Sequence, residues 1–240
     1  TAGGITTLWT QTDKPGVFGD PGTGMFEDVT LGQMPNVNVR WSWELEFVDV
    51  DNDWDLDIIV SAYAGDKASL FLFANDGAGA FTDASAGNVV QGKYALDVET
   101  IDLDGDSFMD LVTLHDGASG RNRVLLNDKK GKFSDLNADK FWPKGINPVS
   151  LDYSLGFYDY DSNKKVDWVV GALETVNLKP PDRLIYEKGG TYAQNIVAFE
   201  QTPVSAGTYS IVLADFNSDH KLDVAMAQNE NAFAKKILLA

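Results

Sequence analysis

A nine-residue pattern of acidic residues recurs four times along the chain. Each copy has Asp at positions 1 and 9 and Asp or Asn at positions 3 and 5. The copies begin at residues 49, 102, 159 and 215, so 53, 57 and 56 residues separate successive copies. The side chains are Asp49, Asp51, Asp53 and Asp57; Asp102, Asp104, Asp106 and Asp110; Asp159, Asp161, Asn163 and Asp167; and Asp215, Asn217, Asp219 and Asp223. This period predicts a repeat protein in which each copy is one supersecondary unit.

A glycine-containing turn followed by an aromatic residue keeps the same phase. The four turns are GTGMFEDVT, GAGAFTDAS, GKFSDL and GGTYAQ, with aromatic residues Phe26, Phe81, Phe133 and Tyr192. In the three complete repeats, the aromatic residue follows the first Asp by 32, 31 and 33 residues. Two independent markers in one phase argue against chance and in favour of a true repeat.

Each repeat contains four short runs typical of β-strands. The first run ends at the Asp pattern, the second begins at its last Asp, the third is apolar, and the fourth holds the aromatic marker. Four strands in roughly 55 residues is the size of one propeller blade. We therefore predict an all-β fold, a β-propeller of four-stranded antiparallel blades over 1–240, or part of one. The predicted blades are 1–35 in part, 36–88, 89–140, 141–200 and 201–240 in part.

The Asp pattern has the chemistry of a calcium loop between the first and second strands. Side-chain oxygens at positions 1, 3, 5 and 9 and a backbone carbonyl at position 7 can surround a cation that takes about six to eight oxygens. The position-7 carbonyls belong to Asp55, Phe108, Lys165 and Lys221. Metals that prefer sulfur or imidazole are disfavoured, because the loops contain no Cys and one His. We expect up to four Ca²⁺ per chain, which would offset the acidic charge beside buried strands.

An EF-hand and a metal-free turn account for the pattern less well. An EF-hand needs a bidentate Glu at position 12, where this chain has Val60, Thr113, Val170 and Met226. Asp and Asn also favour turns without any metal. A metal-free turn fits one copy more readily than four copies in register.

The four loops resemble the FG-GAP repeats of integrin α-subunit propellers and the related bacterial VCBS-type repeats, in which the loop runs Asp-x-Asp-x-Asp-Gly-x-x-Asp. The stretches NDGAGAFTD at 75–83 and NDKKGKFSD at 127–135 are similar to the turn of that family into the outer strand. The resemblance implies Ca²⁺ in each loop and favours the bacterial-type branch. This chain departs from the family at position 6, where Trp54, Ser107, Lys164 and His220 replace Gly. A left-handed backbone is expected there, so loop geometry at Asp49–Asp57 is the most affected.

The number of blades leaves two arrangements open. The chain starts with what resembles a third and a fourth strand, ITTLWT and GMFEDVT, and it ends with the third strand KKILLA. In one arrangement the N-terminal strands close a four-bladed ring, although ITTLWT and KKILLA then compete for one place. In the other, which we favour, the chain is part of a larger propeller. A partner chain or self-association would then complete the ring.

Composition excludes some partners. The formal net charge is −17, which repels nucleic acid and anionic membranes. No apolar stretch approaches the roughly 20 residues that span a bilayer. There is no cysteine, so no disulfide framework is expected.

The leading functional hypothesis is a calcium-binding, non-enzymatic propeller that is secreted, periplasmic or at the cell surface. It would bind a protein or glycan through loops on one face, as in cell adhesion. The segment 137–152, NADKFWPKGINPVSLD, is the best recognition loop. No nucleophile with a base partner is evident, so an enzyme is the weaker alternative.

The alternatives are a propeller domain of, or accessory to, a secreted lyase or hydrolase, and a scaffold subunit of a larger assembly. The first of these predicts a polar pocket near the propeller axis. Its perturbed carboxylates would be residues such as Glu46 and Glu99. More generally, five acids precede the loops on the strands expected nearest the axis and could form an acidic channel that attracts cationic groups: Glu44, Glu46, Asp97, Glu99 and Asp152. Solvated strand positions, or support for the loops, are the plainer interpretation of these acids.

Overall fold

The computed structural model describes ten ranges of the chain: 8–12, 25–39, 41–62, 69–115, 122–135, 152–173, 182–192, 196–198, 207–228 and 235–238. Within these ranges the fold is all-β apart from one short helical turn, α1 (Thr30–Gln33). The Asp28 carboxylate accepts the backbone N–H of Thr30 at 3.0 Å at the start of this turn. None of the described helices has the length and apolar character to span a membrane.

The strands form four blade-like antiparallel sheets and one hairpin. Blade 1 contains β3 (Ser42–Val48), β4 (Asp57–Ala62), β5 (Leu70–Asn75) and β6 (Phe81–Asp83). Blade 2 contains β7 (Ala95–Ile101), β8 (Asp110–His115), β9 (Arg123–Asn127) and β10 (Phe133–Ser134). Blade 3 contains β11 (Asp152–Tyr158), β12 (Asp167–Ala172), β13 (Arg183–Ile185) and β14 (Ile196–Ala198). Blade 4 contains β15 (Thr208–Ala214), β16 (Asp223–Gln228) and β17 (Lys235–Leu238). The hairpin pairs β1 (Trp9–Thr12) with β2 (Met25–Asp28).

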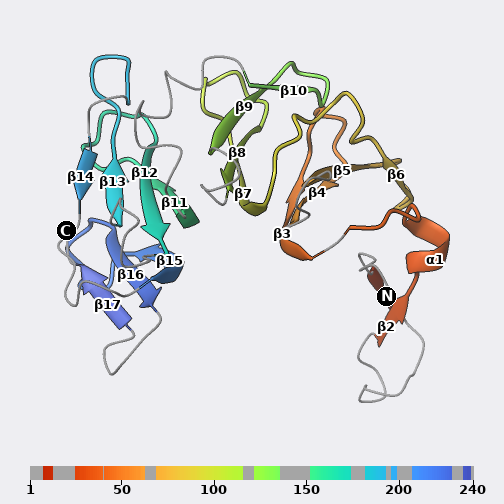
Figure 1. The fold of residues 1–240 in the computed structure, drawn as a ribbon, viewed down its shortest axis with the longest axis horizontal. Helices are drawn as coiled ribbons and strands as arrows, with labels where there is room; N and C mark the ends of the chain where they lie inside the picture. Colours follow the sequence, from red (N-terminus) through yellow and green to blue (C-terminus); the bar gives the residue numbers. More distant parts are fainter. Residues whose placement is uncertain are drawn as a thin grey trace.

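The blades follow one another around an arc, and the N-terminal hairpin and blade 4 lie at its two ends (Figure 1). Among the described strands, β1 and β2 pair only with each other, and β17 pairs with β16. The third-strand place of blade 4 therefore belongs to KKIL at 235–238, and the N-terminal hairpin does not take it. The described strands form blades but no closed ring.

The second strands of blades 1 to 3 pack on both faces, because alternate side chains point to opposite faces of a sheet. In β4, Ile58 and Val60 pack with Met34 and Val39 of the N-terminal segment, whereas Ile59 packs with blade 2. The same alternation recurs in β8 and β12. Leu111 faces blade 1 and Val112 faces blade 3; Trp168 faces blade 2 and Val169 faces blade 4. The hydrophobic core is thus a series of layers between consecutive blades.

The predicted strand order is confirmed in blades 1 and 2, where the marker residues Phe81 and Phe133 begin the fourth strand. Blade 3 differs, since its fourth strand is β14 and Tyr192 precedes it. Lys188 and Thr191 form an isolated bridge around the Gly189–Gly190 turn. Tyr192 then turns inward, and its hydroxyl donates to the Val166 carbonyl at 2.6 Å. The tight glycine turn thus directs this aromatic residue into the core before the strand begins.

Every first strand carries a β-bulge near its beginning. The register against the second strand shifts between Ser42 and Glu44, Ala95 and Asp97, Asp152 and Ser154, and Thr208 and Ser210. One extra residue in each first strand therefore lies opposite no partner. A bulge redirects the side chain that it carries.

Candidate metal centre

Each Asp pattern forms the loop between the first and second strands of a blade, as predicted. We refer to these as Asp loops 1 to 4, at residues 49–57, 102–110, 159–167 and 215–223. The last Asp of each is buried at the start of the second strand. In Asp loop 2, Asp110 accepts the backbone N–H of Leu103 at 3.0 Å and that of Asn127, on the third strand, at 2.8 Å.

The same pair of bonds recurs in the other complete blades. Asp57 accepts from Val50 at 3.0 Å and from Asn75 at 2.8 Å. Asp167 accepts from Tyr160 at 2.7 Å and from Glu187 at 2.8 Å. In the three complete blades, the position-9 carboxylate therefore joins the loop and the start of the second strand to the end of the third strand or, in blade 3, to a residue just after it.

The position-1 carboxylate shapes the turn itself. In Asp loop 3, Asp159 accepts the backbone N–H groups of Asn163 at 2.9 Å and Lys164 at 2.8 Å. Asp215 makes the same contacts with Asp219 at 3.1 Å and His220 at 2.9 Å. The position-5 side chain then accepts the N–H of position 7. These bonds join Asp53 to Asp55, Asp106 to Phe108, Asn163 to Lys165, and Asp219 to Lys221.

Two residues of every Asp loop adopt a left-handed backbone. At position 6, Trp54, Ser107, Lys164 and His220 have φ between 66° and 77°. This confirms that position 6 requires the conformation that Gly adopts at least cost. Position 4 is left-handed as well, in Asn52, Gly105, Ser162 and Ser218. The sequence signal for position 4 was its restriction to Asn, Gly and Ser, residues that are common in such turns.

Three Asp loops bring carboxylate oxygens close enough to hold one metal ion. In each set the ligand atoms lie within 4.8 Å of one another. The sets are Asp49, Asp51 and Asp53; Asp102, Asp104 and Asp110; and Asp159, Asp161 and Asp167. All donors are oxygen, which is the donor type that Ca²⁺ prefers. In Asp loop 1 the fifth carboxylate, Asp55, has a buried Oδ1 with no hydrogen-bond partner among the described residues.

The loops differ in which predicted ligands they assemble. Asp loop 1 gathers positions 1, 3 and 5, whereas loops 2 and 3 gather positions 1, 3 and 9. Within the described residues, Asp loop 4 has no such set. Its position 3 is Asn217, whose Nδ2 donates to Asp219 at 3.1 Å. The carbonyls proposed at position 7 remain a prediction.

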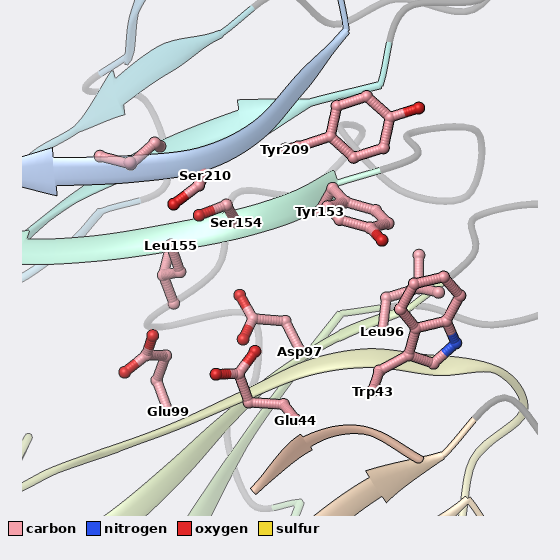
Figure 2. Close-up of a pocket in the computed structure, with 11 residues that line it drawn as sticks. Trp43, Glu44, Leu96, Asp97, Glu99, Tyr153, Ser154, Leu155, Tyr209 and Ser210 are labelled. Carbon is pink, nitrogen blue, oxygen red and sulfur yellow. The ribbon is translucent and has the colours of Figure 1, made fainter. Parts of the chain in front are cut away.

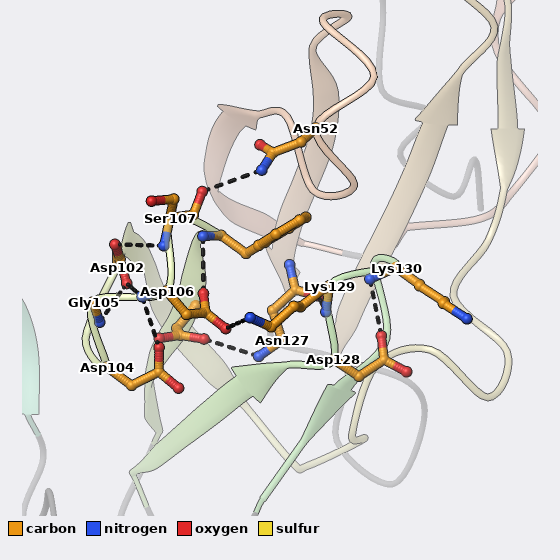
Figure 3. A network of polar contacts seen from close by, with 12 residues as sticks. Asn52, Asp102, Asp104, Gly105, Asp106, Ser107, Asn127, Asp128, Lys129 and Lys130 are labelled. Carbon is orange, nitrogen blue, oxygen red and sulfur yellow. Dashed lines mark hydrogen bonds and ion pairs between the residues drawn. The ribbon is translucent and has the colours of Figure 1, made fainter.

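A lysine occupies part of Asp loop 2 (Figure 3). The Lys129 ammonium lies 3.1 Å from Asp106 Oδ2 and 5.7 Å from the centre of the Phe108 ring. The Phe108 N–H and then Lys129 lower the pKa of Asp106. Asp106, which does not belong to the Asp102 set, is thus paired with a cation from the turn after the third strand. Nothing in the repeat spacing indicated it.

One carboxylate in each of the three sets has a raised pKa. Burial raises the pKa of Asp110 to about 6, and repulsion from Asp104 and Asp106 adds to this effect. Burial, then Asp53 and Asp49, raise the pKa of Asp51. Burial is also the main cause of the raised pKa of Asp167. Repulsion between like charges at short range is relieved by a cation placed among them, so the donor sets fit a divalent metal.

Neighbouring blades are joined beside the Asp loops. Asn52 Nδ2 donates to the Ser107 carbonyl at 3.2 Å, from loop 1 to loop 2 (Figure 3). Asn127 Nδ2 donates to the Val50 carbonyl at 2.8 Å and to the Met109 carbonyl at 3.0 Å. Asn127 therefore joins the third strand of blade 2 to both loops. Hydrogen bonds thus connect Asp loop 1 to Asp loop 2 both directly and through Asn127.

The other predicted sites have mixed outcomes. Glu44, Asp97 and Glu99 line a common pocket between the first strands. Asp152 does not belong to it, because its carboxylate forms a buried pair with Arg183, with both oxygens at 2.8 Å. Of the proposed recognition loop 137–152, all but Asp152 lies outside the described residues.

The comparisons with known proteins agree with this geometry. A family model described as FG-GAP-like repeat matches residues 49–113 and 102–170, together about half of the chain. The matches begin at the first residues of Asp loops 1 and 2, and they include Asp loop 3. The comparison with curated proteins gave no match. On the strength of the two matched repeats and the loops that they contain, the chain belongs to the FG-GAP-like repeat family.

Proposed function

We propose that this chain is a calcium-binding, non-enzymatic propeller segment that acts outside the cytoplasm, at a cell surface, in a periplasm or as a secreted protein. The observation that carries the proposal is the assembly of three Asp triads at equivalent places in consecutive blades. Asp loop 4 would add a fourth, weaker site through Asp215, Asn217, Asp219 and Asp223. Loops of modest affinity fill at the higher calcium concentrations found outside cells.

Calcium would act on the fold through this chain's own backbone contacts. The position-9 carboxylates of loops 1 to 3 already accept backbone N–H groups from the end of the third strand or, in loop 3, from just after it. In loops 2 and 3, a cation held between position 9 and positions 1 and 3 would place positive charge among three carboxylates, of which the one at position 9 is buried. We expect the ion to stabilise the native state without changing the strand order.

The face that carries the Asp loops fits a protein or glycan partner. Apolar side chains on this face are exposed: Trp54 by 95%, Leu56 by 54%, Tyr160 by 51% and Phe216 by 47%. Exposed aromatic and apolar groups beside fixed charges are typical of binding surfaces. Partner binding at this face would depend on calcium, because the ion fixes the loops.

The test is the calcium stoichiometry of the purified chain, measured by native mass spectrometry or equilibrium dialysis. We expect three or four Ca²⁺ per chain. Substituting Asp102→Ala and Asp104→Ala together should remove one ion and leave the others. A chain that binds no calcium at millimolar concentration, or that loses none in this variant, contradicts the proposal.

Two other roles are favoured by one observation each. The pocket between the first strands contains the perturbed carboxylate Glu99, as an enzyme or enzyme-accessory domain would require. Glu99→Ala would then abolish turnover of a substrate while the chain stays folded.

Leu45 and Phe47 of β3 are 38% and 54% exposed on the side away from blade 2, where a further blade would pack. A scaffold role, with a partner or second copy completing the ring, predicts a larger native complex in light scattering.

A further inference from the structure

A cavity lies between the first strands of all four blades. Its volume is about 300 Å³, and its lining comes from β3, β7, β11 and β15. The lining residues belong mostly to the first half of each strand, whereas the Asp loops follow the last residue. The cavity is therefore at the other end of the first strands from the Asp loops, and it is a separate site.

The β-bulges direct side chains into this cavity. The four bulged residues are Trp43, Leu96, Tyr153 and Tyr209, and all of them line it. The bulge is common to the four blades, but the side chains are not, since three are aromatic and one is aliphatic. Bulges that redirect side chains are enriched beside functional sites.

The three aromatic residues form one wall (Figure 2). The ring centres of Trp43 and Tyr153 are 5.7 Å apart, and those of Tyr153 and Tyr209 are 5.1 Å apart, both edge to face. Trp43 is 50% exposed and Tyr209 is 44% exposed, so part of each ring is open to solvent. Exposed aromatic faces of this kind attract cations.

Carboxylates and hydroxyls complete the cavity. Glu44, Asp97 and Glu99 come from blades 1 and 2, and Ser154 and Ser210 come from blades 3 and 4 (Figure 2). Asp97 is only 3% exposed and its carboxylate points into the cavity. Its side-chain neighbour is another acid, Glu44, and it has no cationic partner among the described residues. Burial, then Glu99 and Glu44, raise the pKa of the Asp97 carboxyl well above its usual value, and a cation bound beside it would favour its ionised form.

We infer that this cavity binds an organic cation, an ammonium or guanidinium group. Carboxylates and serine hydroxyls accept its N–H groups, and the Trp43 and tyrosine rings contact its apolar or charged face. A metal ion fits less well, because within the described part of the chain these three acids do not form a set with oxygens within 4.8 Å. Burial, then Glu46 and Glu44, raise the pKa of Glu99 to about 7, and a bound cation would favour its ionised form.

Two sources can supply such a group: a free small amine, or the arginine or lysine side chain of a partner protein. The probe for the first is ethylguanidinium, with ethylurea as its uncharged isostere. The probe for the second is the peptide acetyl-Gly-Arg-Gly-amide, with citrulline in place of arginine as its control. Binding is followed by titration calorimetry at about pH 8, above the value of about 7 to which burial raises the pKa of Glu99, with calcium in excess.

The wild-type chain should bind both cationic probes in saturable fashion and neither neutral control. Asp97→Asn should weaken binding by about ten-fold or more, because it removes a buried charge partner. Trp43→Leu, at a half-exposed position, and Glu99→Gln test the same site if Asp97→Asn fails to fold. Asp128→Asn, an equal change of charge in the turn after β9, should leave binding unchanged. A peptide that binds about ten-fold more tightly than ethylguanidinium identifies a partner side chain as the source; equal affinities identify a free amine.

Ethylguanidinium binding no better than ethylurea would overturn the inference. Equal ethylguanidinium affinity in the wild type and in a folded Asp97→Asn or Glu99→Gln variant would also overturn it. Bound calcium is measured in the same samples. Normal calcium content without cation binding contradicts this inference alone, whereas cation binding without calcium contradicts the proposed function alone.

Discussion

The carboxylate of Asp110, at the start of β8, accepts the backbone N–H of Asn127, at the end of β9, at 2.8 Å. Its other oxygen accepts the N–H of Leu103 at 3.0 Å. The last Asp of the loop thus has a structural role that needs no metal. Asp104 differs, because it is exposed and, among the described residues, accepts only the N–H of Asp106, at 3.2 Å.

These two residues separate the structural and metal-binding roles. In chelator, Asp110→Ala should lower the free energy of unfolding by about 2–4 kcal/mol, since it leaves two backbone donors unsatisfied. Asp104→Ala should change it by less than about 0.5 kcal/mol under the same conditions. With calcium present, Asp104→Ala should lose stability relative to the wild type. Urea unfolding with and without chelator measures both. Equal effects of the two variants in chelator would show that position 9 has no separate structural role.

Backbone conformation at position 6 gives a second prediction. Trp54 has φ of 77° and is 95% exposed, so its side chain contributes little packing while its backbone is strained. Trp54→Gly should raise the free energy of unfolding by about 0.5–1 kcal/mol. Gly105→Ala is the matched control, since φ is 82° and an added Cβ meets nothing within 4 Å. It should lower the same quantity by about 1 kcal/mol through backbone strain alone. A destabilising Trp54→Gly would mean that the indole makes contacts important to the loop.

The buried pair between Asp152 and Arg183 gives a third prediction. The side chains are 0% and 1% exposed, and Asn122 Nδ2 donates to Asp152 Oδ2 at 2.5 Å. Asp152→Ala should lower the free energy of unfolding by about 3–5 kcal/mol, because it leaves a buried guanidinium without its partner. Asp152→Ala combined with Arg183→Met should recover much of this loss. If the double variant is no more stable than the single one, the cost comes from packing and not from the unpaired charge.

The pH dependence of stability has a defined sign. Burial raises the pKa of Glu99 to about 7 and that of Asp110 to about 6. Such groups stabilise the folded state fully below the pKa of an unfolded carboxyl, and this contribution is lost as the pH rises through the folded value. In chelator, the melting temperature should therefore fall as the pH rises from about 5 to about 8. Glu99→Gln should reduce the part of this change between about pH 6 and 8. A melting temperature that rises over this range contradicts the assignment.

The repeat period and the position of each Asp predicted the first, second and third strands and the loops between them. These features depend on the local alternation of apolar and polar side chains and on the residue preferences of turns, both of which can be read from the sequence. Contacts between distant residues were not predicted. Asp152 was expected among the acids of the pocket, but it pairs with Arg183, 31 residues away.

Lys129 and the bulges were missed for a related reason. Lys129 reaches Asp106 from the turn after the third strand, so no spacing within the Asp loop reveals it. A bulge shifts the register by one residue without a fixed residue type, and here it carries Trp43, Leu96, Tyr153 and Tyr209. Tyr192 was expected within the fourth strand of blade 3, but it follows the Gly189–Gly190 turn and lies before β14.

The most direct test of the calcium loops is a thermal melt of the same preparation in calcium, in magnesium and in chelator. Ions that bind only the native state at about 100 times their dissociation constants add about 2.7 kcal/mol per site. With three or more sites, calcium should raise the melting temperature by about 10 °C or more over chelator. Magnesium should raise it far less, because Mg²⁺ retains its waters in preference to such loops. Identical melting temperatures in calcium and in chelator would contradict calcium binding and leave the Asp loops as turns without a metal.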